Sequence, residues 1–242
     1  MSNFKIPILM YHSIELMPKN TVMKSLHVPP KKFAFQMWML KVMGYKALSL
    51  KELQPYLKGN KIGKVVGLTF DDGYQNNLIN AAPILLKYNF TATCYIVSER
   101  IGKSNTWDLH KGITQRPLMT ENEIHEWINL GMDIGAHSRT HIDLSKVSEK
   151  VARIEINDCK KDLEKKFKIT VTDFCYPFGR FNKIVANLAK SSGYFSSTTM
   201  LRGRVNSQSD FHQLPRIPIN YRTLPHLFIA KILTRYEDNK QH

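Results

Sequence analysis

The chain has 242 residues, 43% of them hydrophobic, and its 35 Lys and Arg outnumber 20 Asp and Glu to give a formal net charge of +15. It has neither low-complexity tracts nor repeats of fixed period, which excludes a disordered chain, a solenoid and a propeller and predicts one domain over residues 1–242. The charge favours anionic partners, but no run of five Lys or Arg occurs, so specific nucleic-acid binding is not expected.

The cysteines and the N-terminal segment bear on the compartment. Cys94, Cys159 and Cys175 are spaced neither as a zinc ribbon nor as a disulfide framework, so reduced thiols are expected. The first apolar run is short and contains Pro7 and His12, which predicts neither a signal peptide nor a membrane span. We therefore expect a cytoplasmic protein, with room for contact with the anionic inner face of the membrane.

The first part of the chain alternates between strand and helix patterns. Residues 6–12 and 65–70 are short apolar runs typical of buried strands. Residues 30–44, 49–59 and 76–88 have helical patterns, and Pro55 is expected to bend or shorten the second of them.

The alternation continues through the middle of the chain. Residues 92–97 and 132–137 predict strands. Between them, residues 120–131 begin with Thr120 and Glu123 in the spacing of a capping box, which predicts a helix. The long amphipathic stretch 148–167 predicts another helix.

The last part of the chain completes the pattern. Residues 173–178, 194–199 and 213–219 predict strands, and residues 182–193 predict a helix. Seven apolar strands alternating with helices predict an α/β fold, namely a single distorted (β/α)7-type barrel. In such barrels the functional side chains follow the carboxyl ends of the strands.

Two carboxylates stand where the second predicted strand ends. Asp71 and Asp72 precede Gly73, and alone this triplet is more often a turn with a helix cap than a site. Farther along, His137 and His141 are four residues apart, so a helical turn there would place both imidazoles on one face. Two histidines and one carboxylate leave coordination positions open, as in a catalytic zinc site. The second aspartate can then act as a base toward a bound water.

Three motifs resemble those of a known family, the NodB-homology polysaccharide deacetylases of carbohydrate esterase family 4. "TFDDG" (69–73) resembles the first motif, "HSRTH" (137–141) the second and "YPFG" (176–179) the end of the third. The segments "ILMYHSI" (8–14) and "LPRIPI" (214–219) resemble the branch of the poly-N-acetylglucosamine deacetylases.

The resemblance implies roles for five residues. Asp72, His137 and His141 would bind a divalent metal, zinc by preference, with Co²⁺ or Ni²⁺ able to substitute. Asp71 would be the general base. The backbone N–H of Phe178 would help to hold the oxyanion.

The sequence departs from the family pattern in two places. Cys175 stands where the third motif usually has an Arg that tethers the base, and no L-x-L-H motif with a general-acid histidine is found near the C-terminus. Arg216 is a candidate replacement for the Arg, although an ordinary rim arginine is the alternative. His12 is a candidate acid, with a structural rim histidine as the alternative.

Four further residues are assigned to substrate binding. Trp107 can stack on a sugar ring and Asp108 can hydrogen-bond its hydroxyls, although a Trp that covers the barrel mouth is an equal alternative. Tyr74 and Pro177, beside the first motif and within the third, are assigned with them.

The expected activity is metal-assisted hydrolysis of N-acetyl groups on the N-acetylhexosamine units of a cell-envelope glycan or of a lipid-linked glycan, with release of acetate. A non-catalytic glycan-binding relative that retains the metal site is the main alternative. Two His and one carboxylate also describe non-haem iron oxygenases, which the strand–helix alternation disfavours. A cytoplasmic location would favour a lipid-linked or nucleotide-linked precursor, or a lipopolysaccharide intermediate, as the substrate.

Overall fold

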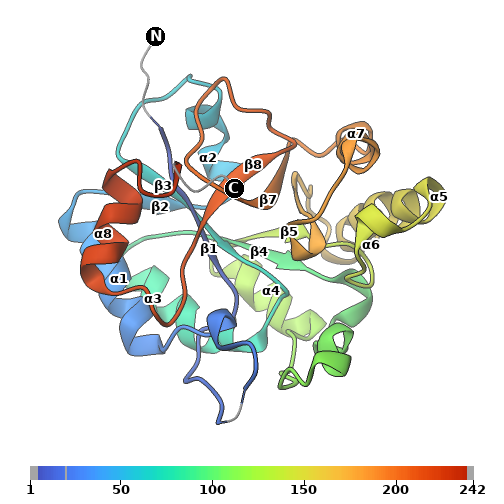
Figure 1. Ribbon diagram of the computed structural model, residues 1–242, viewed down its shortest axis with the longest axis horizontal. Helices are drawn as coiled ribbons and strands as arrows, with labels where there is room; N and C mark the ends of the chain where they lie inside the picture. Colours follow the sequence, from blue (N-terminus) through green and yellow to red (C-terminus); the bar gives the residue numbers. More distant parts are fainter. Residues whose placement is uncertain (1–4, 20, 239–242) are drawn as a thin grey trace.

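The computed structural model describes residues 5–19 and 21–238 and shows a parallel sheet rolled into a barrel (Figure 1). Eight strands are found in this part of the chain. They are β1 (Ile8–Tyr11), β2 (Lys46–Leu48), β3 (Val65–Phe70), β4 (Thr93–Ile96), β5 (Asp133–Ala136), β6 (Asp173–Cys175), β7 (Ser196–Arg202) and β8 (Leu214–Pro218).

Seven of these strands close the ring in the order β1-β8-β7-β6-β5-β4-β3, and the pairing of β3 with β1 completes it. Ile8 lies opposite Gly67 and Tyr11 opposite Phe70 at this closing pair. The remaining strand, β2, pairs with the first half of β3, whereas β4 pairs with its last two residues. The predicted (β/α)7-type barrel is therefore confirmed, with β2 as an addition outside the ring.

Helices surround the barrel and return the chain from one strand to the next (Figure 1). They are α1 (Pro30–Val42), α2 (Leu50–Leu57), α3 (Ala82–Lys87), α4 (Glu121–Asn129), α5 (Glu149–Arg153), α6 (Cys159–Phe167), α7 (Lys183–Ser191) and α8 (Pro225–Leu233). Short 3₁₀ turns are η1 (Lys24–Leu26), η3 (Ser98–Arg100), η4 (Thr106–Lys111), η5 (Leu144–Lys146) and η7 (Pro177–Gly179), and π-helical turns are η2 (Asn77–Ala81) and η6 (Ile154–Asp158).

Local sequence signals account for several helix ends. The capping box predicted for α4 is present, because Thr120 accepts from the Glu123 N–H and Glu123 accepts from the Thr120 N–H. Pro55 lies inside α2, and the helix ends two residues later. No helix of the described residues combines the length and the apolar character that a bilayer crossing requires.

Aromatic side chains pack the core behind the end of β3. Tyr11 meets Phe33 edge-to-face at 5.2 Å between ring centroids, and Phe70 meets Trp127 in the same manner at 5.9 Å. All four are buried. The backbone that carries the two aspartates therefore continues from a rigid strand.

At the end of the barrel where the strands begin, the carboxyl groups of Asp133 and Asp173 lower the stability of the fold at neutral pH. Asp133 and Asp173 begin β5 and β6, and burial, together with the charge of Asp173, raises the pKa of Asp133 to about 7. The ordinary pKa of Asp is about 3.9, so the folded chain holds a proton that the unfolded chain has lost between about pH 4 and 7. The stability of the fold should therefore fall as the pH rises through this window.

We expect Asp133→Asn to remove this dependence. Asn keeps the oxygen that accepts from the Thr93 hydroxyl, so at pH 8 the melting temperature should rise by about 2 °C or more, with little change at pH 4. Thermal unfolding of both chains at pH 4, 6 and 8 measures the difference, with exposed Glu126→Gln as the control. Equal melting temperatures at pH 8 would contradict the expectation.

Candidate active site

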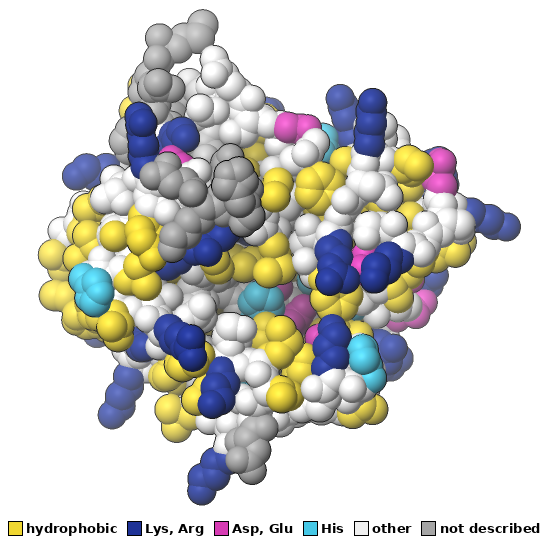
Figure 2. All heavy atoms as spheres, viewed as in Figure 1, with side chains coloured by type: hydrophobic (Ala, Val, Ile, Leu, Met, Phe, Trp, Pro, Cys, Tyr) yellow, Lys and Arg dark blue, Asp and Glu magenta, His cyan; other side chains and the backbone are white. Residues whose placement is uncertain are grey.

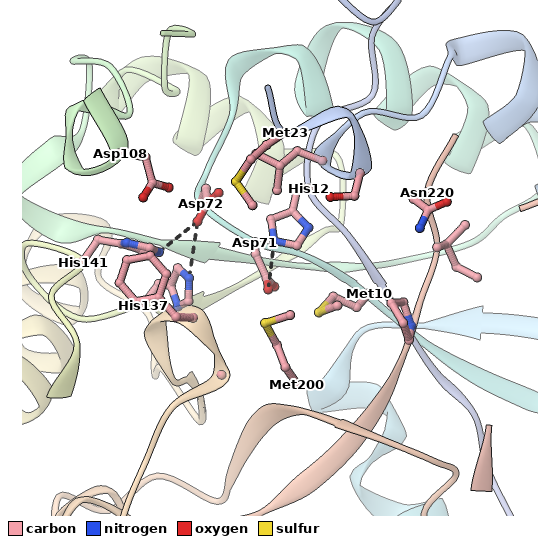
Figure 3. A pocket seen from close by; sticks show the side chains of 16 residues that line it. Met10, His12, Met23, Asp71, Asp72, Asp108, His137, His141, Met200 and Asn220 are labelled. Atoms are coloured by element: carbon pink, nitrogen blue, oxygen red, sulfur yellow. Dashed lines mark ion pairs between the residues drawn. The ribbon is translucent and has the colours of Figure 1, made fainter. Parts of the chain in front are cut away.

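The carboxyl ends of the strands surround a cavity of about 160 Å³. Near the centre of Figure 2, histidine and carboxylate atoms lie between hydrophobic side chains. The residues that line the cavity are Met10, His12, Met23, Ser25, Leu26, Asp71, Asp72, Asp108, His137, His141, Phe178, Gly179, Met200, Pro218, Ile219 and Asn220. The close-up shows Asp72, Asp108, His137 and His141 on the left and Met10 and Asn220 on the right, with Asp71 and His12 near the centre (Figure 3).

The buried Arg216 side chain binds Asp71. The guanidinium approaches both carboxylate oxygens of Asp71, with Nη1–Oδ1 at 2.6 Å and Nη2–Oδ2 at 2.8 Å. Its other donors reach the Thr199 carbonyl at 2.9 Å, the Thr69 hydroxyl at 3.1 Å and the Cys175 sulfur at 3.2 Å. All five N–H groups of the buried guanidinium are therefore satisfied, and Asp71 is fixed in one orientation.

This contact keeps Asp71 ionised. Burial favours the neutral carboxyl, but the charge and hydrogen bonds of Arg216 outweigh it, so the pKa of Asp71 lies below its ordinary value. Arg216 comes from β8 rather than from the third motif. Cys175 lies beside the pair, with its sulfur 3.2 Å from Arg216 Nη2 and 3.7 Å from Asp71 Oδ2. An ionised carboxylate with a fixed orientation has the form that a general base requires.

Asp72 faces the two histidines instead. Its Oδ1 lies 3.4 Å from His137 Nε2 and 3.2 Å from His141 Nε2. All three side chains are buried, and one donor atom from each lies within 4.8 Å of the others. Burial opposes the charge of Asp72, but hydrogen bonds from both imidazoles hold the pKa of this carboxyl well below its usual range.

The second motif does not turn helically, so a shared helix face is not what brings His137 and His141 together. Ser138 and His141 have φ values of 60° and 66°, in the left-handed region, and no helix is present from residue 137 to 143. The Ser138 hydroxyl accepts from the His141 N–H at 2.9 Å and stabilises the reversal. The imidazoles of His137 and His141 meet all the same, with ring centroids 4.8 Å apart.

A buried carboxylate in η6 holds this loop in place. Glu155 Oε2 accepts from the backbone N–H groups of Arg139 and Thr140, at 2.9 Å each, and Oε1 accepts from the Thr140 hydroxyl at 2.8 Å. These three bonds fix the loop between the two histidines. The sequence contains only a weak signal for this role, an acid between Ile154 and Ile156 in an apolar helix stripe.

We expect Glu155→Ala to weaken metal binding by about 10–100-fold, because the loop that sets the distance between His137 and His141 loses three hydrogen bonds. Isothermal titration with Zn²⁺ or Co²⁺ measures the affinity. Glu149→Ala, which breaks only an exposed ion pair with Arg153, is the matched control. An affinity equal to that of the wild type would assign Glu155 to folding alone.

The donor set of Asp72, His137 and His141 fits a zinc ion. His137 Nδ1 lies 2.8 Å from the Cys175 carbonyl, so this nitrogen donates its hydrogen there, and the lone pair of Nε2 is left to bind a cation beside Asp72. One carboxylate and two imidazoles are ligands that zinc prefers, and they leave positions open. Asp71, His137 and Cys175 form a second cluster of possible metal ligands. It is less suited to a cation, because Arg216 already neutralises the charge of Asp71.

His12 enters the cavity from the end of β1 and lies 3.8 Å from Asp71, between its Nε2 and Oδ2 (Figure 3). Three asparagine side chains form hydrogen bonds with the backbone of the segment that carries His12. Asn77 donates to the His12 carbonyl at 2.8 Å, Asn80 donates to the Ile14 carbonyl at 2.7 Å, and Asn76 accepts from the Ile14 N–H at 3.0 Å. We did not predict that these asparagines bind the loop that carries His12. The sequence signal for this role was the group of asparagines that follows the first motif.

Phe178 occupies a strained turn at the cavity wall. Its φ is 56°, and its ring meets the His141 ring edge-to-face at 4.6 Å. A Cβ on the next residue, Gly179, would lie 2.4 Å from Met200, so only glycine fits there. Phe178 and Gly179 both line the cavity, and the role of the Phe178 N–H at the oxyanion stays a prediction.

The four residues assigned to substrate binding lie in different places. Asp108 lines the cavity and pairs with Lys111 at 2.6 Å. Trp107 stacks on His141, with ring centroids 4.3 Å apart, and is not among the lining residues. Tyr74 is buried and hydrogen-bonds Asp72, and Pro177 is the buried first residue of the third-motif turn. Of the four, the structure brings only Asp108 to the cavity.

Comparisons with known proteins agree with this geometry. Residues 58–196 match the family model described as polysaccharide deacetylase. The polysaccharide deacetylase YxkH of Bacillus subtilis (strain 168), by its name a member of this family, is 31% identical over 218 residues, 89% of this chain and 72% of its own. The poly-beta-1,6-N-acetyl-D-glucosamine N-deacetylase of Staphylococcus aureus (strain MRSA252) is 28% identical over 84% of this chain and 71% of its own.

A solved structure extends the likeness to the whole barrel. The Streptococcus pyogenes deacetylase PplD, in complex with acetate, is 29% identical and superposes with a TM-score of 0.82 over 95% of this chain and 98% of its own. The chain therefore belongs to the polysaccharide deacetylase family, and its relatives include poly-N-acetylglucosamine deacetylases.

Proposed function

We propose that the protein is a metal-dependent hydrolase that removes N-acetyl groups from N-acetylhexosamine units and releases acetate. One observation carries the proposal. Asp71 and Asp72 are neighbours in the chain, but Arg216 holds the first, whereas the second faces His137 and His141, and both open onto one cavity. Two carboxylates in such different environments can perform two different tasks.

Asp72, His137 and His141 would hold the cation. When bound, the cation supplies Lewis-acid chemistry, which polarises a carbonyl and lowers the pKa of a water molecule. Asp71 accepts the proton of the attacking water, because Arg216 keeps it ionised and directed at the cavity. The Phe178 N–H donates to the oxygen on which charge develops, a contact that typically contributes ~3 kcal/mol. His12 protonates the leaving amine.

The names of two relatives support the substrate class. One acts on a poly-N-acetylglucosamine by its name, and another was solved with acetate, the product that this reaction would release. Arg216 supports catalysis over glycan binding alone, because a protein that only binds a glycan has no need of a base tethered at both oxygens.

Chelation should abolish the activity, and metal should restore it. Acetate release from N-acetylglucosamine oligomers, measured before and after treatment with a chelator and after addition of Zn²⁺ or Co²⁺, tests the dependence. We expect a loss of more than about 100-fold and recovery with either ion. Metal binding without acetate release from soluble or lipid-linked substrates would support the glycan-binding alternative. Acetate release unaffected by the chelator would overturn the metal dependence.

A further inference from the structure

Large apolar side chains are exposed around the mouth of the cavity. Leu16 is 74% exposed, Val22 63% and Leu109 58%, and Met200 and Leu224 are half exposed. Leu16 and Val22 lie in the loop after β1, Leu109 lies in η4 after β4, and Leu224 follows β8. Met200 lies in the second half of β7 and lines the cavity, so all five belong to the carboxyl end of the barrel. We call these five residues the apolar rim.

The apolar rim continues into the cavity. Met23 and Met200 are exposed to solvent and also line the cavity, where Met10 joins them near Asp71 and His12 (Figure 3). An apolar wall therefore extends from the catalytic carboxylate to the outer surface. A site for free oligosaccharides has little use for such a wall, whereas an amphiphilic ligand would bury apolar area on it.

Positive charge accompanies the apolar rim. Lys19, Lys24 and Arg222 lie on the same loops and form no ion pair with a described carboxylate, and Figure 2 shows Lys and Arg side chains around the central histidine and carboxylate atoms. Carboxylates at this end are paired within the chain, as Glu15 with Arg116 and Asp143 with Arg180 illustrate. The surface is therefore apolar and cationic at once.

We propose that the apolar rim docks on an anionic phospholipid bilayer, so that the enzyme takes a membrane-borne, lipid-linked N-acetylhexosamine as its substrate. The part that concerns the substrate rests on the proposed deacetylase function. Apolar side chains with adjacent cations are the combination that binds anionic membrane surfaces. A second copy of this chain is a poorer occupant, because it would bring two surfaces of like charge together.

Vesicle binding tests the docking directly. We expect the wild type to co-sediment with phosphatidylcholine–phosphatidylglycerol vesicles, more weakly at high salt and weakly with phosphatidylcholine alone. The double variant Leu16→Ser/Val22→Ser should bind at least ~10-fold more weakly. The matched control is Val42→Ser/Ile62→Ser, two residues at least as exposed that end α1 and precede β3, at the other end of the barrel.

Activity on two substrates separates this inference from the proposed function. We expect Leu16→Ser/Val22→Ser to keep wild-type acetate release from soluble oligomers but to lose at least ~10-fold with an N-acetylglucosamine joined through diphosphate to a long-chain alcohol in vesicles. Acetate release from soluble oligomers by a wild type that does not bind vesicles would overturn docking and leave the deacetylase standing. Wild-type dimers in light scattering that the variant abolishes would assign the rim to a second copy.

Discussion

Replacing Asp71 by Asn is expected to lower the rate of deacetylation by about 10²–10⁴-fold, because the amide cannot accept the proton of the attacking water. Asn keeps one oxygen for Arg216, and the separate cluster of Asp72 and the two histidines is untouched. The variant should therefore bind Zn²⁺ with nearly wild-type affinity.

Acetate release under saturating substrate and titration with Zn²⁺ measure the two properties on one preparation. Asp143→Asn, which affects an exposed ion pair with Arg180, serves as a control for general effects of losing a carboxylate. A rate within tenfold of the wild type would show that another group takes the proton. A parallel loss of metal binding would show that Asp71 contributes to the metal site instead.

Removing Arg216 should produce the largest loss of stability. Arg216→Met leaves Asp71 buried without its partner, which typically costs about 3–5 kcal/mol and corresponds to a fall in melting temperature of roughly 6–20 °C. The variant Arg216→Lys should recover only part of the loss, because an ammonium cannot reach both oxygens of Asp71 and the Thr199 carbonyl together.

The double variant Asp71→Asn/Arg216→Met decides whether the cost arises from the unpaired charge. If it does, the double variant should be more stable than Arg216→Met alone, and thermal unfolding of the four chains completes the cycle. Additive losses in the double variant would indicate that Arg216 stabilises the barrel through packing rather than through the carboxylate of Asp71.

The barrel was predictable because its strands are buried on both faces. Residues 65–70 form β3 with the predicted bounds, since a continuous apolar run has few alternatives. The strand β2 was missed because three residues, of which Lys46 is exposed, give no periodicity. The predicted strand 173–178 is observed only as Asp173–Cys175, because the third-motif turn begins directly after Tyr176.

Site residues were predictable where sequence motifs place them, and less so where distant segments meet. The predicted metal ligands lie together as expected, namely Asp72, His137 and His141. The loop between the two histidines is bound by Glu155, whose role was missed because helical periodicity does not reveal such a contact. Arg216 meets Asp71 from a strand 145 positions away, a contact that a single sequence suggests only through the missing third-motif Arg. Such long-range contacts depend on barrel closure, which residue patterns do not specify in detail.

The two π-helical turns restrict which single-residue deletions this protein can tolerate. An α-helix rotates about 100° per residue, so one extra residue in a wide turn puts the segments before and after it out of phase. In η2 and η6 this offset lets Asn77 and Glu155 face the catalytic loops, while Leu85 in α3 and Leu163 in α6 still face the core. A single-residue deletion in either turn would therefore rotate one of these functions away from its target, and lineages that retain activity should keep the extra residue.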